Sequence, residues 1–233
     1  MFNGKLKAVT FSYDDGIMQD QRLISIFNKY GLKATFNINS GYLGTPNRLV
    51  REDVTVEFVR PCAEEIRSVY EGHEIAGHTL THALLTKCSD EQVVKEVEED
   101  RLRLSELAGY EVCGFAYPGG SVGCFDNRVA RIIKEHTGIK YARTAVSSHS
   151  FSLPDNIFQY KPTVYHHAEW DKMFDLANEF LSSDTKEPAL FYVWGHSFEF
   201  DIHNTWDRFE EFCRLISGHN DVFYGTNREV FDI

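Results

Sequence analysis

The chain has 233 residues, of which 42% are hydrophobic and 25% charged, which is typical of one soluble globular domain. Its formal charge of −11 argues against nucleic acid, anionic membrane surfaces and strongly acidic polymers as partners. No stretch approaches the ~18 apolar residues that span a bilayer. The composition leaves the oligomeric state open.

The N-terminus and the cysteines bear on location. The opening MFNGKLKAVTF has no apolar signal-peptide core, and strand-like sequence begins almost at once. The five cysteines are odd in number and form no CxxC pair, which is typical of reduced structural thiols. We therefore expect a cytoplasmic protein, although a secreted chain trimmed of its signal would look the same.

Strand-like and helix-like segments alternate along the chain. Strands are expected at 7–13, 34–38, 73–76, 112–116, 141–145, 158–164, 189–194 and 222–224. Helices are expected at 19–30, 63–70, 90–107, 127–136, 170–181 and 206–216, with Ser89 as an N-cap and Gly109 as a stop. A polar excursion fills 41–60. This alternation predicts one α/β domain over residues 1–233, with a parallel sheet closed into a barrel.

Two adjacent carboxylates end the first strand, in VTFSYDDG at 9–16. Catalytic side chains of such barrels lie where strands end and the following loops begin. Adjacent strand residues point to opposite sides, so Asp14 and Asp15 are expected to differ in role. One can bind a cation while the other moves a proton. By itself Asp-Asp-Gly is equally well a turn with a helix N-cap.

The segment HTLTH places His78 and His82 four residues apart, just after the third expected strand. Two such imidazoles lie on one face when the segment is helical, and can then bind one metal ion. An HxxxH pattern is not rare in a chain with 10 histidines, but this one follows a strand end equivalent to Asp14-Asp15. Two imidazoles and one carboxylate leave a position open for water, as in catalytic zinc sites.

Two later strand ends carry further candidates. In FAYPGG at 115–120, Pro118 fixes the backbone direction, while Gly119 and Gly120 let main-chain amides approach a ligand. Such an amide can stabilise an oxyanion. In FYVWGHSFEF at 191–200, His196 can donate a proton across the barrel mouth, with a packed core histidine as the alternative.

In this order the segments resemble the polysaccharide deacetylase family, carbohydrate esterase family 4, over nearly the whole chain. The family's TFDDG motif reads SYDDG at 12–16, its H(S/T)xxH motif is intact at 78–82, and its RxPxG motif reads AYPGG at 116–120. His196 matches the late histidine motif. The resemblance implies a distorted, incomplete (β/α) barrel with about seven parallel strands.

The resemblance also implies a metal site and an activity. One divalent ion would be held by Asp15, His78 and His82. Zinc is preferred, and cobalt, nickel or manganese suits the same ligands. The expected reaction is hydrolytic removal of N-acetyl groups from an amino sugar, oligosaccharide or polysaccharide. Deformylation or hydrolysis of another small amide, and a catalytically silent carbohydrate-binding module, are the alternatives.

By the same resemblance, Asp14 would be the general base, His196 the general acid, and the amide of Gly119 would help hold the oxyanion. Ala116 stands where the family often has an arginine that orients the base, and no Asp-x-x-Asp motif follows. Arg143 of the next strand can replace that arginine, because parallel strands lie only ~4.8 Å apart. A solvent-facing arginine is the alternative. Gly119 also replaces a usual aromatic residue, which would open the cleft.

Other residues near the strand ends have less distinctive roles. Sugar rings stack on aromatic side chains, although most aromatics belong to cores. The candidates are Tyr42, Trp170, Trp194, Phe198 and Trp206. His166 and His167 either contact substrate or lie on the surface, and Glu199 and Asp201 either bind hydroxyls or cap a turn.

Overall fold

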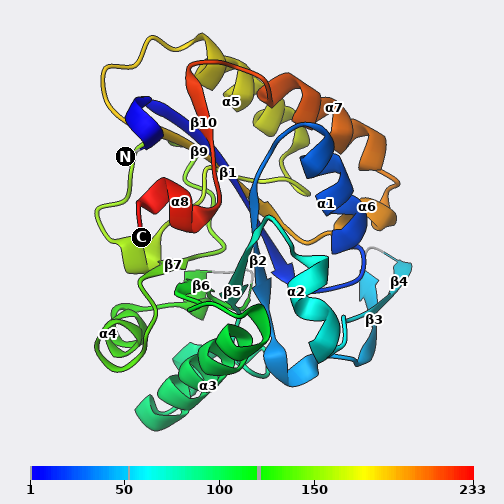
Figure 1. Ribbon diagram of the computed structural model, residues 1–233, viewed down its shortest axis with the longest axis vertical. Coiled ribbons are helices and arrows are strands. Elements are labelled where there is room, and N and C mark those ends of the chain that lie inside the picture. The colour runs from blue at the N-terminus through cyan, green and yellow to red at the C-terminus, as the bar shows by residue number, and fades with distance from the viewer. Residues whose placement is uncertain (1, 52, 120–121) are drawn as a thin grey trace.

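The computed structural model describes residues 2–51, 53–119 and 122–233, and consists of a central parallel sheet flanked by helices (Figure 1). The strands are β1 Lys7–Asp15, β2 Ala34–Ile38, β3 Pro46–Arg51, β4 Val54–Val59, β5 Glu74–Gly77, β6 Gly114–Ala116, β7 Tyr141–Arg143, β8 Val164–Tyr165, β9 Ala189–Gly195 and β10 Val222–Tyr224. The helices are α1 Asp20–Lys29, α2 Ile66–Val69, α3 Asp90–Ala108, α4 Asn127–His136, α5 Trp170–Ser182, α6 Glu199–Ile202, α7 Trp206–Ile216 and α8 Asn227–Phe231.

The main sheet is a distorted, incomplete barrel, as predicted. Its strands follow the order β7-β6-β5-β2-β1-β9-β8, and β10 pairs with β1 outside that path. The segment before β8 approaches the opposite edge, because Tyr160 forms an isolated parallel bridge with Arg143. The amide of Tyr160 donates to the carbonyl of Ala142 at 3.0 Å. The two edges therefore nearly meet, and the strand ends surround one mouth.

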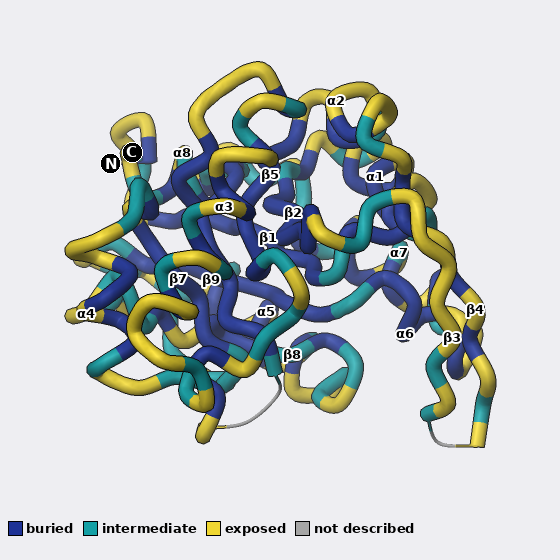
Figure 2. The backbone as a smooth tube through the Cα atoms, turned by 90° about the horizontal axis from the view of Figure 1, so that it is seen from below, coloured by how far each residue is buried: buried dark blue, intermediate teal, exposed yellow. Residues whose placement is uncertain are grey.

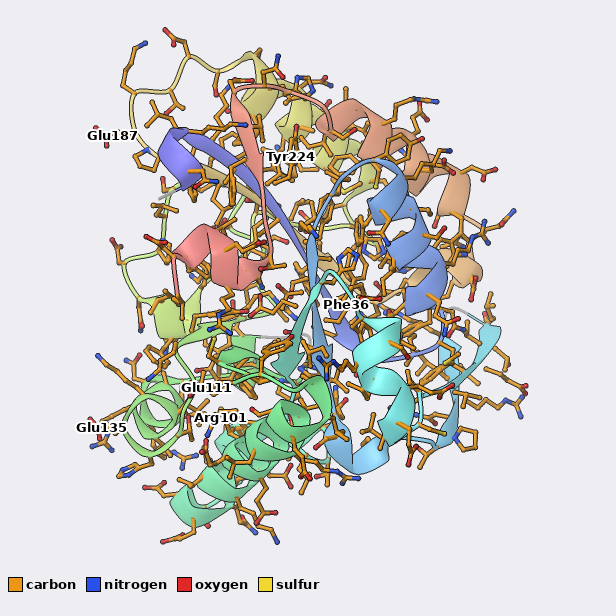
Figure 3. All side chains as sticks on the ribbon, viewed as in Figure 1. Phe36, Arg101, Glu111, Glu135, Glu187 and Tyr224 are labelled. Carbon is orange, nitrogen blue, oxygen red and sulfur yellow. The ribbon has the colours of Figure 1, made fainter. Side chains whose placement is uncertain are left out.

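Apolar side chains on both faces of the strands form the core. The helix α1 buries Leu23 and Phe27, four residues apart on one face, and the ring centroid of Phe27 lies 4.7 Å from that of Phe11 on β1. Phe36 of β2, labelled in Figure 3, lies 4.9 Å from the ring of Tyr70 just after α2. Full burial of each such aromatic side chain stabilises the fold by about 2–3 kcal/mol.

The helix α3 begins and ends as its sequence predicts. Ser89 Oγ accepts from the amide of Gln92 at 3.3 Å, and the side chain of Gln92 accepts from the amide of Ser89 at 2.9 Å, which is a capping box. Gly109 ends the helix with φ of +78°, in the left-handed region that favours glycine. This long helix passes beneath β5 and carries Asp100 to the main chain of His78.

The excursion at 41–60 contains a β-hairpin that the sequence analysis did not predict. β3 and β4 pair antiparallel, with Pro46 opposite Val59 and Arg51 opposite Val54. Val56 and Phe58 are buried, while Thr55, Glu57 and Val59 are exposed, so the alternation in VTVEFV was the available signal. Figure 2 shows the hairpin extending from the body of the molecule.

The predicted strand at 158–164 is wrong. Phe158 lies in a single 3₁₀ turn, Ile157–Gln159, because the side chain of Asn156 accepts from its amide at 3.0 Å. Pro162 has no N–H for a ladder, so β8 is confined to Val164–Tyr165. The predicted helix at 63–70 divides into a 3₁₀ turn and α2.

No helix of the described ranges has the length and apolar character needed to cross a membrane. A single domain over residues 1–233 remains a prediction.

Candidate active site

The ends of β1, β5 and β9 bring the predicted site residues to one mouth of the barrel. In the parallel ladders Tyr13 lies level with Gly195, and Ile38 of β2 lies level with Gly77. Asp14 and Asp15 come directly after Tyr13, His78 comes after Gly77, and His196 comes after Gly195. Parallel strands therefore place side chains from distant parts of the sequence side by side.

Asp15, His78 and His82 form a group that can hold a metal ion. One ligand atom from each lies within 4.8 Å of the others. The Oδ1 atom of Asp15 is 3.9 Å from Nε2 of His78 and 3.6 Å from Nε2 of His82. The two imidazole centroids are 5.0 Å apart.

The segment from His78 to His82 is a turn, which corrects the helical geometry considered for it. Thr79 and His82 have φ of +64° and +55°, in the left-handed region. The side-chain amide of Asn39 donates to the carbonyls of both His78 and Thr79, the latter at 2.9 Å, and thereby stabilises the turn. The rings converge because the turn folds back on itself, not because they share a helix face.

The donor atoms of this group fit a divalent cation. Oδ1 of Asp15 is buried without a hydrogen-bond partner among the described residues. Nδ1 of His78 donates to the carbonyl of Ala116 at 2.8 Å, which leaves the lone pair of Nε2 directed at Asp15. Burial lowers the pKa of His78 to about 4, so its ring is neutral, as metal binding requires.

Asp14 and Asp15 have different surroundings, although both carboxylates lie within 4.0 Å of Nε2 of His78. They are not on opposite sides as in a regular strand, because Asp15 has φ of +79°. Asp14 is buried, with one oxygen paired with the guanidinium of Arg143 and accepting from Nδ2 of Asn37 at 2.8 Å. Its other oxygen lies 4.0 Å from Nε2 of His78. Burial alone would raise the pKa of Asp14, but the charge of Arg143 and its hydrogen bond to the carboxylate hold that pKa below the ordinary value. Asp14 is therefore a carboxylate.

Arg143 is buried, so the alternative of a solvent-facing arginine is wrong. Its Nε donates to Oγ of Ser12 at 3.1 Å and its Nη1 to the carbonyl of Thr144 at 3.2 Å. The guanidinium also lies over the ring of Trp194, 4.9 Å from the centroid. These contacts place Arg143 beside Asp14, where an orienting group is needed. Its effect on turnover remains a prediction.

His196 is paired with Glu199, three residues further along the chain. The amide of His196 donates to Glu199 at 3.0 Å, and its Nδ1 lies 3.2 Å from the other carboxylate oxygen. Burial would lower the pKa of His196, but Glu199 raises it to about 9. Tyr165 and Arg51 also donate to this buried carboxylate. Glu199 thus positions and charges His196, a role that sequence reasoning missed although the spacing of three residues was visible.

Gly119 lies beyond the end of β6 with φ of +95°. A Cβ atom there would lie 2.4 Å from Sγ of Cys124 and 2.9 Å from Leu84. This crowding and the backbone conformation, not the opening of a cleft, account for the glycine. Gly120 lies outside the described residues, and the proposed contact of the Gly119 amide with an oxyanion remains a prediction.

A cleft of about 660 Å³ opens beside the metal-binding group. Its lining includes Asp15 and His82 together with Phe58, Arg60 and Phe198. A larger hollow of about 850 Å³ lies next to it, between the hairpin and Met18-Gln19, but contains none of the predicted site residues. The smaller cleft is therefore the candidate substrate site.

The aromatic candidates divide between the cleft and the core. Tyr42 and Phe198 line the cleft. Trp194 supports Arg143, and Trp206 is buried against the ring of Phe200 at 4.6 Å. Trp170 packs beside His166 at 5.7 Å. Asp201 accepts from the indole of Trp206 at 2.7 Å and therefore holds α6 against α7.

His166 belongs to the core, so neither substrate contact nor surface exposure describes it. Its ring stacks on Phe200 at 4.4 Å, and a Cβ at Gly195 would lie 1.9 Å from its Nδ1. His166, His167 and Glu199 also place three ligand atoms within 4.8 Å of one another. Because Glu199 is already engaged by His196, Tyr165 and Arg51, this group is the weaker metal candidate.

These features define an α/β barrel with a candidate His/Asp metal site at the carboxyl ends of its strands. Residues 3–142 match the family model described as polysaccharide deacetylase. The chain belongs to the polysaccharide deacetylase family.

The similar proteins are distant in sequence, and the solved structures among them share the fold. An uncharacterized 30.6 kDa protein from Geobacillus stearothermophilus is 24% identical over 132 residues, which span 56% of this chain and 43% of that protein. A CE4 domain of a multidomain xylanase, from the hindgut metagenome of Trinervitermes trinervoides, is 16% identical with a TM-score of 0.57, over 97% of this chain and 90% of that one. A family 4 acetyl xylan esterase from Clostridium thermocellum, in complex with a cobalt ion, is 15% identical with a TM-score of 0.53, over 97% and 91%.

Proposed function

We propose that this protein is a metal-dependent hydrolase that removes N-acetyl groups from an amino sugar, oligosaccharide or polysaccharide. The proposal rests on one arrangement: an ionised Asp14 beside the group of Asp15, His78 and His82, of which Asp15 and His82 line a cleft. The family and the similarity to an acetyl xylan esterase support a carbohydrate that carries acetyl groups.

Asp15, His78 and His82 would hold one divalent ion, and zinc is our proposal for it. The cobalt ion in the Clostridium thermocellum esterase supports a divalent metal of this kind. When bound, such an ion polarises a carbonyl and lowers the pKa of water. Two nitrogens and one oxygen suit zinc, cobalt, nickel and manganese.

The protein's own residues would move the protons. Asp14 removes a proton from the water that attacks the amide carbonyl, while Arg143 and Asn37 fix the direction of its carboxylate. The amide of Gly119 would donate to the oxyanion. His196 then gives its proton to the departing nitrogen as the C–N bond breaks, which yields acetate and a free amine. The high pKa of His196 suits an amine leaving group, which needs an acid more than an alcohol does.

Release of acetate from a panel of N-acetylated and O-acetylated sugars, with and without a chelator, tests this function. We expect release from at least one N-acetylated sugar, its loss on chelation, and its return with added zinc. Formate release from N-formyl sugars alone would indicate a deformylase. Sugar binding without any release would indicate a silent binding module. Release that persists after chelation would contradict the metal site.

A cytoplasmic location is also a proposal. It is supported by the five cysteines, since no disulfide joins any of them in the described part of the chain. Thiol titration of protein recovered from native cells, with alkylation at lysis, would test it. Quantitative disulfides would contradict it.

A further inference from the structure

Arg60 is a buried cation without a carboxylate partner. It follows β4 at the base of the hairpin and is only 6% exposed. Among the described residues, its Nε has no hydrogen-bond partner and no carboxylate forms an ion pair with its guanidinium. The charge of Asp15 acts on it only from beyond ion-pair distance. Charged groups are rarely buried unless they are paired, because desolvation is unfavourable by several kcal/mol.

The other buried arginines show what Arg60 lacks. Arg143 is paired with Asp14, and Arg101 donates to both oxygens of Glu98 at 2.8 and 2.7 Å. Arg51, on the same hairpin, is only half-buried and is still paired with Glu199 at 2.5 Å. In this fold a buried guanidinium therefore normally has an acid beside it, and Arg60 is the exception among the buried arginines described.

The guanidinium of Arg60 is held in place without using its hydrogen-bond donors. It lies 4.9 Å from the ring centroid of Tyr42 and 5.4 Å from that of Phe58. The main-chain amide of Arg60 donates to the carbonyl of Thr45 at 3.1 Å, which anchors the base of the hairpin. The aromatic contacts fix the side chain while leaving its planar set of N–H donors for another molecule.

The small exposed part of Arg60 opens into the candidate substrate cleft, which it lines together with Asp15 and His82. A ligand that places an acetamido group at the metal-binding residues would therefore lie against the guanidinium. Because a guanidinium matches the geometry of carboxylates and phosphates, an anionic oxygen group is the partner that it fits best.

We infer that Arg60 forms an anion subsite, so that the substrate carries a carboxylate or phosphate group near the acetamido group. This inference rests on the proposed deacetylase function and narrows its substrate class. It concerns one local charge: the net charge of −11 still opposes long polyanions. Carboxylate and phosphate share the required chemistry, and the experiment separates them.

The test compares three acetamido sugars that differ in charge: neutral N-acetylglucosamine, N-acetylmuramic acid with a carboxylate, and N-acetylglucosamine 6-phosphate. Their Kd values are measured by calorimetry on the wild-type protein and on Arg60→Gln. We expect one anionic sugar to bind at least ~10-fold more tightly than the neutral one, and Arg60→Gln to weaken that binding alone by about 10- to 100-fold. The anionic sugar that binds more tightly shows whether the group recognised by Arg60 is a carboxylate or a phosphate.

Arg48→Gln is the matched control, because Arg48 lies exposed on the same hairpin and lines the other hollow. It removes the same charge and should leave all three Kd values unchanged. Thermal unfolding establishes that each variant folds. If Arg60→Gln does not fold, Arg60→Lys replaces it. Lysine keeps the charge but not the planar donors, so the expected loss of affinity for the anionic sugar is smaller.

Three outcomes would overturn the inference: similar or unmeasurable binding of the anionic sugars by the wild type, equal weakening of neutral and anionic sugars by Arg60→Gln, or the same effect from Arg48→Gln. Calorimetry needs no turnover, so the anion subsite and the deacetylase function are tested independently of each other. Anion-selective binding without acetate release would contradict only the deacetylase function. Release without an anion preference would contradict only the subsite.

Discussion

The guanidinium of Arg143 on β7 is ion-paired with the carboxylate of Asp14 on β1, although β6, β5 and β2 lie between these strands in the sheet. The pair therefore crosses the interior of the barrel. Both side chains are buried, and Asn37, which lies level with Asp14 in the neighbouring strand, donates to the same carboxylate oxygen. This geometry predicts that Arg143 fixes the direction in which Asp14 receives a proton.

Arg143→Lys should lower kcat at least ~10-fold while leaving the metal content intact, because lysine keeps the charge but not the planar donors that also contact Ser12 and Thr144. Steady-state kinetics and metal analysis of the same preparation measure the two effects. Unchanged kinetics would show that Asp14 needs no guanidinium for its orientation.

Asp14→Asn should retain metal but lose turnover by about 10²–10⁴-fold, the usual effect of removing a positioned base. The variant also leaves Arg143 buried without its counter-ion, which is expected to destabilise the fold by about 3–5 kcal/mol. Turnover should therefore be measured well below the midpoint of thermal unfolding. Near-normal turnover in folded protein would place the base elsewhere.

The double variant His78→Ala, His82→Ala should contain no bound metal and should release no acetate. Two of the three proposed ligands are then missing, and Asp15 alone does not hold the ion. Elemental analysis after dialysis against a chelator-treated buffer measures occupancy. His203→Ala is a suitable control, because it removes an exposed histidine outside this group, and it should keep one ion per chain. Full occupancy in the double variant would rule out the site.

Glu199→Gln should move the alkaline limb of the pH–rate profile to lower pH. A general acid must be protonated, so activity falls as pH rises through the pKa of His196. Glu199 contributes most to raising that pKa to about 9, ahead of Asp15 and Asp14, so its neutral replacement lowers the pKa. A bound cation lowers the pKa of His196 in both proteins, so the prediction concerns the difference between their profiles.

Asp201→Asn is the control for this experiment, because it neutralises another carboxylate of α6 that contacts Trp206 and not His196. It should leave the alkaline limb in place. If Glu199→Gln lowers kcat equally at every pH, Glu199 has only a structural role. Identical pH–rate profiles for Glu199→Gln and the wild type would show that His196 is not the general acid.

Much of the fold was predictable because the local signals were strong. Ser89 and Gly109 mark the two ends of α3 as expected, and the continuous apolar strands predicted a buried parallel sheet. The hairpin was missed because its alternation is short and lies among polar residues. The strand at 158–164 was overpredicted because Asn156 and Pro162 favour other backbone conformations.

The sequence by itself determined which residue types stand at the strand ends, and so Asp14, Asp15, His78 and His196 could be proposed as site residues. Strand ends and motif spacing are local properties. Only the tertiary structure decided between the two alternatives for Arg143, in favour of the contact with Asp14. It also brought the carbonyl of Ala116 to His78, and placed Arg60 in the cleft without an ion pair among the described residues. Those contacts depend on the curvature of the sheet and on a main-chain atom that every residue has, so the spacing of residues in the chain could suggest the contact of Arg143 but could establish none of them.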